Sequence, residues 1–343
     1  MTQPGPAFVV SSDFNQDGNL DLAVANFDNG TTSILLGDGQ GDFTETVLSN
    51  GDFAAPNTIA LGDVNNDNNI DILVVNNRIS TVSIFLGQGD GNFLFQTPIS
   101  TGSNTTLWGL ALGDLNDDGN LDLVVTDSRR YNLLVFFGAG DGTFEQISTL
   151  STGDLSRPYS VLITDLDGNN LLDLLVSNIG TSNIGVFLGD GTGNFNEQST
   201  YATDAIPYRL ITADFNGDGI IDAATSNFDG DSVSILLGNG SGTFSPQTSI
   251  YIGNGSAPFG IVSGDFDGDT ILDLVVTNSG SNNIALLIGN GDGSFNQTLT
   301  YSTGDDSYPD AVAAGDFNED GRLDIVSANY LTGSLSFFYN TCV

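Results

Sequence analysis

Apolar residues along this chain occur in short runs, not in long segments. Within residues 56–106, PNTIALGD precedes an acidic segment, IDILVVNN (70–77) follows it, and TVSIFLG (81–87) comes next. A glycine-rich segment, GQGDGNF (87–93), then leads into the more polar FLFQTPIS. Short runs of Val, Ile, Leu and Phe bounded by Gly, Asn or Asp are typical of β-strands joined by turns. We therefore predict four strands in this segment, the last of them an outer strand.

The same pattern recurs along the chain with a step of about 50 residues. The other second strands are LDLAVANF (20–27), LDLVVTDS (121–128), LDLLVSNI (172–179), IDAATSNF (221–228), LDLVVTNS (272–279) and LDIVSANY (323–330). Four strands per repeat, seven times, favour an all-β, seven-bladed β-propeller that forms a single domain over residues 1–343. A β-helix is the alternative. The expected blades are 6–55, 56–106, 107–157, 158–206, 207–257, 258–308 and 309–343.

The start of each first strand and the end of the chain refine this expectation. Proline suits the first residue of a strand, where no ladder donor is needed. It stands seven residues before the acidic segment in six repeats, and Leu107 takes its place in the third. The last repeat ends in SLSFFYNTCV, without a glycine-rich turn, and five residues before Pro6 are too few to supply a strand. We therefore expect the last blade to lack its outer strand.

An acidic nine-residue motif separates the first two strands of every repeat. Its first copy is DFNQDGNLD (13–21), and positions 1, 3, 5 and 9 carry Asp or Asn in all seven copies. Position 6 is Gly in four copies. The candidate metal ligands, with position 7 contributing its backbone carbonyl, are Asp13, Asn15, Asp17, Asn19, Asp21, Asp63, Asn65, Asp67, Asn69, Asp71, Asp114, Asn116, Asp118, Asn120, Asp122, Asp165, Asp167, Asn169, Leu171, Asp173, Asp214, Asn216, Asp218, Ile220, Asp222, Asp265, Asp267, Asp269, Ile271, Asp273, Asp316, Asn318, Asp320, Arg322 and Asp324.

Oxygen side chains that alternate around a tight turn are how a loop surrounds a hard cation, and Ca²⁺ accepts six to eight oxygens in irregular geometry. An EF-hand is excluded because its loop needs a glutamate at position 12, which here is Val24 in a strand. A plain Asx-rich turn explains one copy but not seven in register. We predict up to seven Ca²⁺ ions. The sixth loop is the least regular in geometry, because Thr270 is β-branched at position 6.

The composition of the chain limits the classes of binding partner that we expect. The net charge is −37, and seven Ca²⁺ ions would reduce it to −23. All six basic residues are arginines, so nucleic-acid binding, which needs clustered cations, is not expected. The chain has no apolar run of 18 residues and no basic-then-apolar leader before residue 13, so we expect no membrane span and no signal peptide in this chain. With one cysteine, Cys342, no intrachain disulfide can form.

The motif, with a strand before it and LDLVV after it, resembles FG-GAP/VCBS repeats over essentially the whole chain. Such repeats build the seven-bladed propeller of the integrin alpha-chain head, of some fungal lectins and of many secreted microbial proteins. The resemblance implies one Ca²⁺ on the loop between the first two strands of each blade. The phrase FG-GAP itself is not kept, and only PFG at 258–260 is similar to it.

Other features have simple structural interpretations. We expect the glycine-rich turns and Trp108 to serve packing, and Arg130 or Arg129 to pair with Asp127. With no His and no Lys, most acid–base and covalent schemes lose their usual residues, so we expect no enzyme. We expect an extracellular, calcium-binding adhesion or recognition module with a protein or glycan ligand. The alternative is a filament subunit that assembles through strand 333–340 and Cys342, and a carbohydrate-active enzyme is third.

Overall fold

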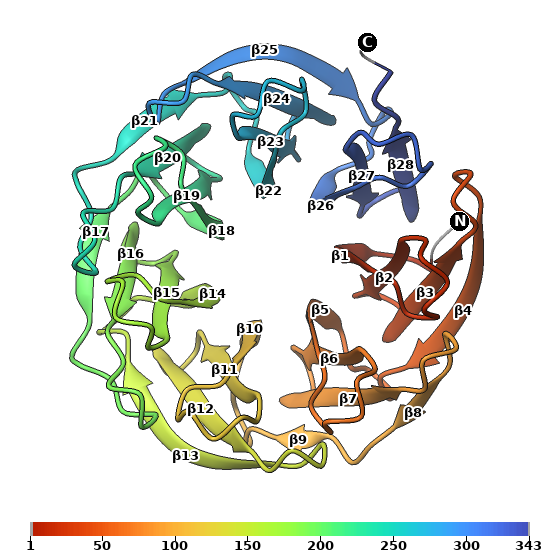
Figure 1. The fold of residues 1–343 in the computed structure, drawn as a ribbon, viewed down its shortest axis with the longest axis vertical. Helices are drawn as coiled ribbons and strands as arrows, with labels where there is room; N and C mark the ends of the chain where they lie inside the picture. The colour runs from red at the N-terminus through yellow and green to blue at the C-terminus, as the bar shows by residue number, and fades with distance from the viewer. Residues whose placement is uncertain (1–2, 342–343) are drawn as a thin grey trace.

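The computed structural model describes residues 3–341, and within this range it contains 28 β-strands and no helix. The strands form seven antiparallel sheets that follow one another around a ring (Figure 1). Each sheet is a meander in which consecutive strands pair. The predicted seven-bladed β-propeller is confirmed, and the β-helix alternative is wrong.

The strands follow the sequence repeat closely. The first three blades comprise β1 (Pro6–Ser12), β2 (Asp21–Asn26), β3 (Thr31–Gly37), β4 (Phe43–Ser49); β5 (Pro56–Gly62), β6 (Asp71–Asn76), β7 (Thr81–Gly87), β8 (Phe93–Phe95), β9 (Ile99–Ser100); and β10 (Leu107–Gly113), β11 (Asp122–Asp127), β12 (Asn132–Gly138), β13 (Phe144–Ser151). The next two comprise β14 (Pro158–Thr164), β15 (Asp173–Asn178), β16 (Asn183–Phe187), β17 (Ser199–Ala202); and β18 (Pro207–Ala213), β19 (Asp222–Asn227), β20 (Ser232–Leu236), β21 (Thr248–Tyr251). The last two comprise β22 (Pro258–Gly264), β23 (Asp273–Asn278), β24 (Asn283–Gly289), β25 (Phe295–Ser302); and β26 (Pro309–Gly315), β27 (Asp324–Asn329), β28 (Ser334–Phe338).

The position of a strand within its blade sets its burial. The first strands, from β1 to β26, lie nearest the axis of the ring, and the fourth strands form the rim (Figure 1). Every residue of the second strands is buried, because neighbouring blades cover both of their faces. This double burial explains why the second strands read as continuous apolar runs and not as an alternating pattern.

The hydrophobic core is divided into clusters that each join adjacent blades. One cluster combines Leu73 and Val75 of the second blade with Leu107 and Leu123 of the third. Another joins Val9 and Leu22 of the first blade to Ala313 and Val326 of the seventh, which closes the ring. A blade therefore cannot bury its own apolar faces without both neighbours, as expected of a repeat array.

The outer strands are less regular than the sequence suggests. FLFQTPIS forms two short pieces, β8 and β9, that both pair with β7, because Pro98 has no N–H to donate to the ladder. In the fourth and fifth blades the outer strand is four residues long, and an isolated bridge to Phe195 or Phe244 precedes it. Outer strands face solvent on one side, so the hydrophobic pattern defines them weakly.

The seventh blade has three strands in the described range, as predicted. All five residues of β28 are partly exposed, whereas the middle of the equivalent strand β3 is buried beneath β4. Phe337 packs against Phe43 of the first blade, with ring centroids 5.1 Å apart. One face of β28 therefore packs against the first blade, whereas its outer edge pairs with no strand in the described range.

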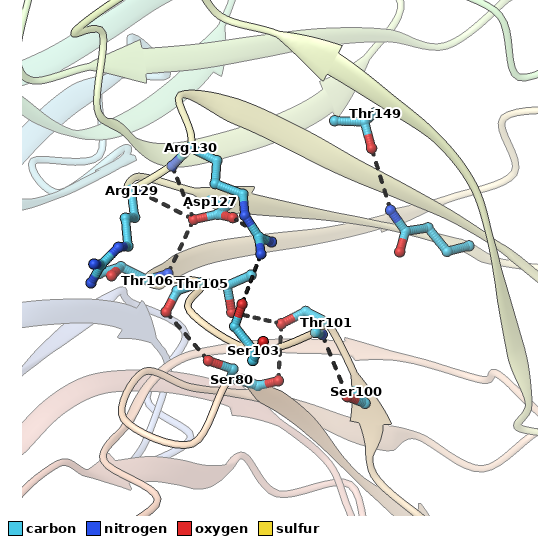
Figure 2. A network of polar contacts seen from close by, with 12 residues as sticks. Ser80, Ser100, Thr101, Ser103, Thr105, Thr106, Asp127, Arg129, Arg130 and Thr149 are labelled. Atoms are coloured by element: carbon cyan, nitrogen blue, oxygen red, sulfur yellow. Dashed lines mark hydrogen bonds and ion pairs between the residues drawn. The ribbon is translucent and has the colours of Figure 1, made fainter.

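A polar network braces the loops around β10 and β11 (Figure 2). Asp127 is fully buried and accepts hydrogen bonds from the backbone N–H groups of Thr106 and Arg129. Its carboxylate lies 3.4 Å from the Arg130 guanidinium, which also donates to the carbonyl of Ser103. The expected pairing of this arginine with Asp127 is confirmed, and its effect is local bracing.

Candidate metal centres in the acidic loops

Each acidic loop turns back on itself through two residues in the left-handed region. In the first loop these are Gln16 at position 4, with φ 58°, and Gly18 at position 6, with φ 92°. The same two positions have positive φ in all seven loops. The sequence indicated position 6 through its glycines, but position 4 carries Gln, Asn, Asp, Glu or Gly and gave no signal.

The aspartate at position 1 closes the turn. Its two oxygens accept hydrogen bonds from the backbone N–H groups of positions 5 and 6, as Asp13 does from Asp17 at 3.2 Å and Gly18 at 2.9 Å. All seven loops repeat the position-6 contact at 2.7 to 2.9 Å. Thr270 takes part with φ 73°, so the sixth loop closes like the others despite its β-branched residue.

Positions 3, 5 and 7 complete the inner wall of the loop. The side-chain oxygen at position 3 accepts the N–H of position 5, and the oxygen at position 5 accepts the N–H of position 7, as between Asp17 and Asn19 at 2.8 Å. In two loops, three carboxylates offer oxygen atoms within 4.8 Å of one another: Asp165, Asp167 and Asp173 in the fourth, and Asp265, Asp267 and Asp269 in the sixth. Elsewhere position 3 is Asn, which also offers an oxygen.

The aspartate at position 9 holds the loop to the rest of its blade. One oxygen of Asp21 accepts the N–H of Phe14, and the other accepts the N–H of Gly37 at the end of β3, both at 2.8 Å. Equivalent pairs of bonds occur in every blade, with Asn340 in place of the glycine in the seventh. Sequence reasoning treated position 9 as a ligand alone and missed this clamp.

Burial makes the position-9 carboxylates unfavourable as bare anions. It raises the pKa of Asp71 and of Asp122 to about 6, although two backbone hydrogen bonds act in the opposite direction. Neighbouring aspartates at positions 1 and 5 raise the pKa further by repulsion. A bound cation would relieve both effects, because it stabilises the ionised form. The seven loops therefore suit a divalent cation with oxygen ligands.

The seventh loop already contains a positive group. The Arg322 side chain donates from Nη2 to Asp320 at 3.1 Å and from Nε to the carbonyl of Asn340 at 3.1 Å. No other loop has a basic residue at position 7. The guanidinium neutralises part of the charge that would attract a metal ion, so this loop differs electrostatically from the other six.

The glycine-rich turns connect five of the seven acidic loops to the next blade through backbone hydrogen bonds. The N–H of Gly91 in the second blade donates to the carbonyl of Phe14 in the first blade at 3.1 Å. Beside it, the Phe93 ring packs edge-on against Phe14, with centroids 5.7 Å apart. Corresponding backbone contacts start from Gly142, Gly193, Gly242 and Gly293. The packing role predicted for these turns is confirmed, and it couples the order of a loop to a blade interface.

Comparison with known proteins supports this architecture. The family model described as FG-GAP-like repeat matches residues 13–74, 63–125, 114–176, 165–225, 214–276 and 265–327. A search of curated proteins gave no match. Within residues 3–341, no helix is long and apolar enough to cross a membrane.

Solved structures share the fold at low sequence identity. Virginiamycin B lyase from Staphylococcus aureus has a TM-score of 0.67 and 14% identity, over 95% of this chain and 92% of that one. An Agrocybe aegerita lectin that recognises non-reducing terminal N-acetylglucosamine has a TM-score of 0.61 and 17% identity, over 98% and 85%. At these identities only the fold is shared, whereas the repeat match spans most of the chain. The chain therefore belongs to the FG-GAP-like repeat family.

Proposed function

We propose that the chain is a calcium-stabilised, extracellular propeller that recognises a protein or glycan ligand. The observation that carries the calcium part is the common geometry of the seven loops, in which oxygens of positions 1, 3, 5 and 9 surround one turn. The three-carboxylate groups of the fourth and sixth loops support it further. An oxygen-only donor set favours Ca²⁺ over zinc or copper. Moderate sites of this kind fill where calcium is abundant, outside cells.

The bound ion would act on the structure, not on a substrate. It would neutralise the carboxylates of a loop whose position-2 residue carries the contact to the next blade, as Phe14 does. Without it, repulsion among the acids would loosen the loops and with them the blade interfaces. The expected role of Ca²⁺ is to rigidify the ring.

A recognition surface is available on the opposite side of the ring. Each first strand ends at its acidic loop, so the segments before the first strands and after the second strands lie at the other end of the blades. Three of these segments expose large apolar side chains: Phe53 is 83% exposed, Leu155 64% and Leu331 63%. These side chains lie on three separate loops of this face, where a ligand that spans the ring could bury them together. This face is where we place the ligand.

Two measurements test the proposal. Calorimetry should show several calcium-binding events, and removal of calcium by a chelator should lower the melting temperature strongly, because binding to the folded state alone stabilises it. Glycan and protein arrays probed with the calcium-loaded chain should give ligands whose binding is lost in a Phe53→Ser, Leu155→Ser double variant. A melting curve that ignores the chelator would contradict the calcium role, and retained array binding by the double variant would move the ligand elsewhere.

A second candidate role is assembly through the edge of β28. The strand is partly exposed along its whole length, and an unpaired strand edge can template the addition of another strand. We propose a strand from another copy as the occupant. Cys342, which we expected to crosslink subunits, lies outside the described residues. Sedimentation of the calcium-loaded chain should show polymers that a Leu335→Pro variant, which loses an edge-facing N–H, does not form, and a strictly monomeric profile would reject this role.

We propose no catalytic role. The lyase of the shared fold loses activity when a histidine is replaced by alanine, and this chain contains no histidine. A carbohydrate-active enzyme would need a carboxylate pair outside the acidic loops. Incubation of the calcium-loaded chain with a panel of oligosaccharides should release no products, and turnover that disappears on aspartate substitution would overturn this expectation.

A further inference from the structure

The inner strands enclose a cavity of about 490 Å³ around the axis of the ring. All seven contribute to its lining, and the wall is mostly apolar, with residues such as Leu61, Leu162, Ile211 and Val262. Arg209 also lines the cavity, as the third residue of its inner strand. In three other inner strands the third residue is small: Gly109, Gly260 and Ala311. The two glycines let the backbone of the next blade approach closely, because a Cβ at Gly109 would meet the carbonyl oxygen of Tyr159 and one at Gly260 that of Asp310.

Arg209, the third residue of β18, is the one ionisable side chain among the described residues that line this cavity. It is only 6% exposed. Its guanidinium carbon lies 4.4 Å from the centre of the Phe8 ring, 5.3 Å from that of Tyr159 and 5.9 Å from that of Phe259. The aromatic faces favour the cation, but they accept no conventional hydrogen bonds from it.

The hydrogen bonds of this guanidinium are incomplete. Nη1 donates to the Thr58 hydroxyl at 2.9 Å, whereas Nε and Nη2 are buried and have no partner among the described residues. Nε and Nη2 lie on one edge of the planar group, and this edge forms two parallel hydrogen bonds to a carboxylate in the common bidentate geometry. A buried charge with two unsatisfied donors is strongly unfavourable, so the site is complete only with an anionic partner.

No carboxylate of residues 3–341 lies within 4.0 Å of the Arg209 nitrogens. Asp310 is the carboxylate whose charge acts on the pKa of Arg209, and its own Oδ1 is buried without a partner. Asp310 is the second residue of β26, and it does not line the cavity. The chain therefore leaves the donor edge of Arg209 to another molecule.

We propose that the central cavity binds a monocarboxylate with an unbranched apolar chain. Its two oxygens accept hydrogen bonds from Nε and Nη2 of Arg209, and its chain occupies the apolar part of the cavity. Apolar walls with one convergent charged group are the usual composition of a small-ligand site, and the volume lies within the usual range. This site is separate from the calcium loops, because Arg209 lies near the start of β18 and the acidic loop follows the end of that strand.

The test uses the full, calcium-loaded chain and the probes octanoate, octanamide and acetate. Trp108 is the only tryptophan and stacks on Tyr159 beside Arg209, with centroids 5.1 Å apart, so its fluorescence reports occupancy. Calorimetry should show one octanoate per chain. Octanamide, which has a similar shape without the charge, should bind at least about tenfold more weakly. Affinity should rise about fourfold with each methylene between acetate and octanoate.

Two variants separate the charge from the cavity. Arg209→Met should abolish the preference for octanoate over octanamide, whereas Arg157→Gln, at an exposed loop arginine, should leave both affinities unchanged. The proposal is overturned if octanoate gives neither heat nor a fluorescence change, if octanamide binds equally well, or if Arg209→Met binds octanoate like the native chain. Should Arg209→Met not fold, the octanoate and octanamide comparison in the native chain decides alone.

Discussion

The hydroxyl of Ser177 in the fourth blade donates a hydrogen bond to the carbonyl of Tyr208 in the fifth, with an oxygen–oxygen distance of 2.8 Å. The same hydroxyl accepts the N–H of Ser160 at 2.9 Å. Thr126, Ser226 and Thr277 form equivalent bridges between successive blades. In these four blades, one buried hydroxyl thus joins inner strands that sequence separates by about 50 residues.

Replacement of Ser177 by alanine should lower the free energy of unfolding by about 1–3 kcal/mol, because a buried N–H and a buried carbonyl each lose their partner. Ser199→Ala, on the exposed outer strand β17, is the matched control and should change it by less than about 0.5 kcal/mol. Urea unfolding in saturating calcium measures both. Equal effects of the two substitutions would show that the bridge does not stabilise the ring.

The two aspartates of one loop should respond differently to substitution. Asp122 accepts N–H groups with both oxygens, so Asp122→Asn directs an amide N–H at a backbone donor and should cost about 1–3 kcal/mol even in chelator. Asp118 is exposed, and Asp118→Asn should destabilise only the calcium-loaded protein. Unfolding curves with and without calcium distinguish a clamp from a ligand, and a calcium-dependent loss for both variants would contradict the clamp.

A glycine pair separates steric contact from backbone strain. Gly193 and Gly168 have φ of 79° and 75°. A Cβ at Gly193 would overlap with the Phe137 ring, whereas a Cβ at Gly168 meets no atom within 4 Å. In both alanine variants, a side chain on a left-handed backbone should lower the free energy of unfolding by about 1–2 kcal/mol. In Gly193→Ala, overpacking at the blade interface should lower it by about a further 1–3 kcal/mol. Thermal unfolding of the two variants should therefore rank Gly168→Ala above Gly193→Ala.

The seventh loop should bind calcium more weakly than the others, because Arg322 pairs with Asp320 at 3.1 Å. Arg322→Leu copies the position-7 residue of the fourth loop, Leu171, and removes this competing cation. In a calorimetric titration, the calcium affinity of the weakest site should then increase. The increase should be about tenfold for each 1.4 kcal/mol of repulsion removed. Arg157→Leu serves as a control for the change in net charge. An unchanged titration would mean that the guanidinium turns away when the ion binds.

Asp310 should make stability depend on pH. Burial raises its pKa from 3.8 to about 7, with Arg209 acting in the opposite direction. Between these values the folded protein keeps a proton that the unfolded chain has released, so the contribution to stability is full at low pH and is lost as pH rises through about 7. Asp310→Asn should remove this loss. Urea unfolding at about pH 5 and about pH 8 should show a smaller drop for the variant, and identical drops would refute the assignment.

The sequence by itself determined the number of blades, the limits of the inner strands and the composition of the acidic loops. These features are local: Pro56 begins a strand because it needs no donor, and an aspartate closes a turn four or five residues away. Fixed spacing within about 50 residues suffices to specify them.

The tertiary structure alone decided what meets across the ring. Asp21 became a clamp through the N–H of Gly37, which belongs to another strand. Arg209 reached Thr58, 151 residues away, because ring closure brings the third residues of different inner strands to one axis. Its partial pairing depends on side chains of four other blades, and no local pattern encodes such a contact, because each of these blades contributes only one residue to it: Phe8, Thr58, Tyr159 and Phe259.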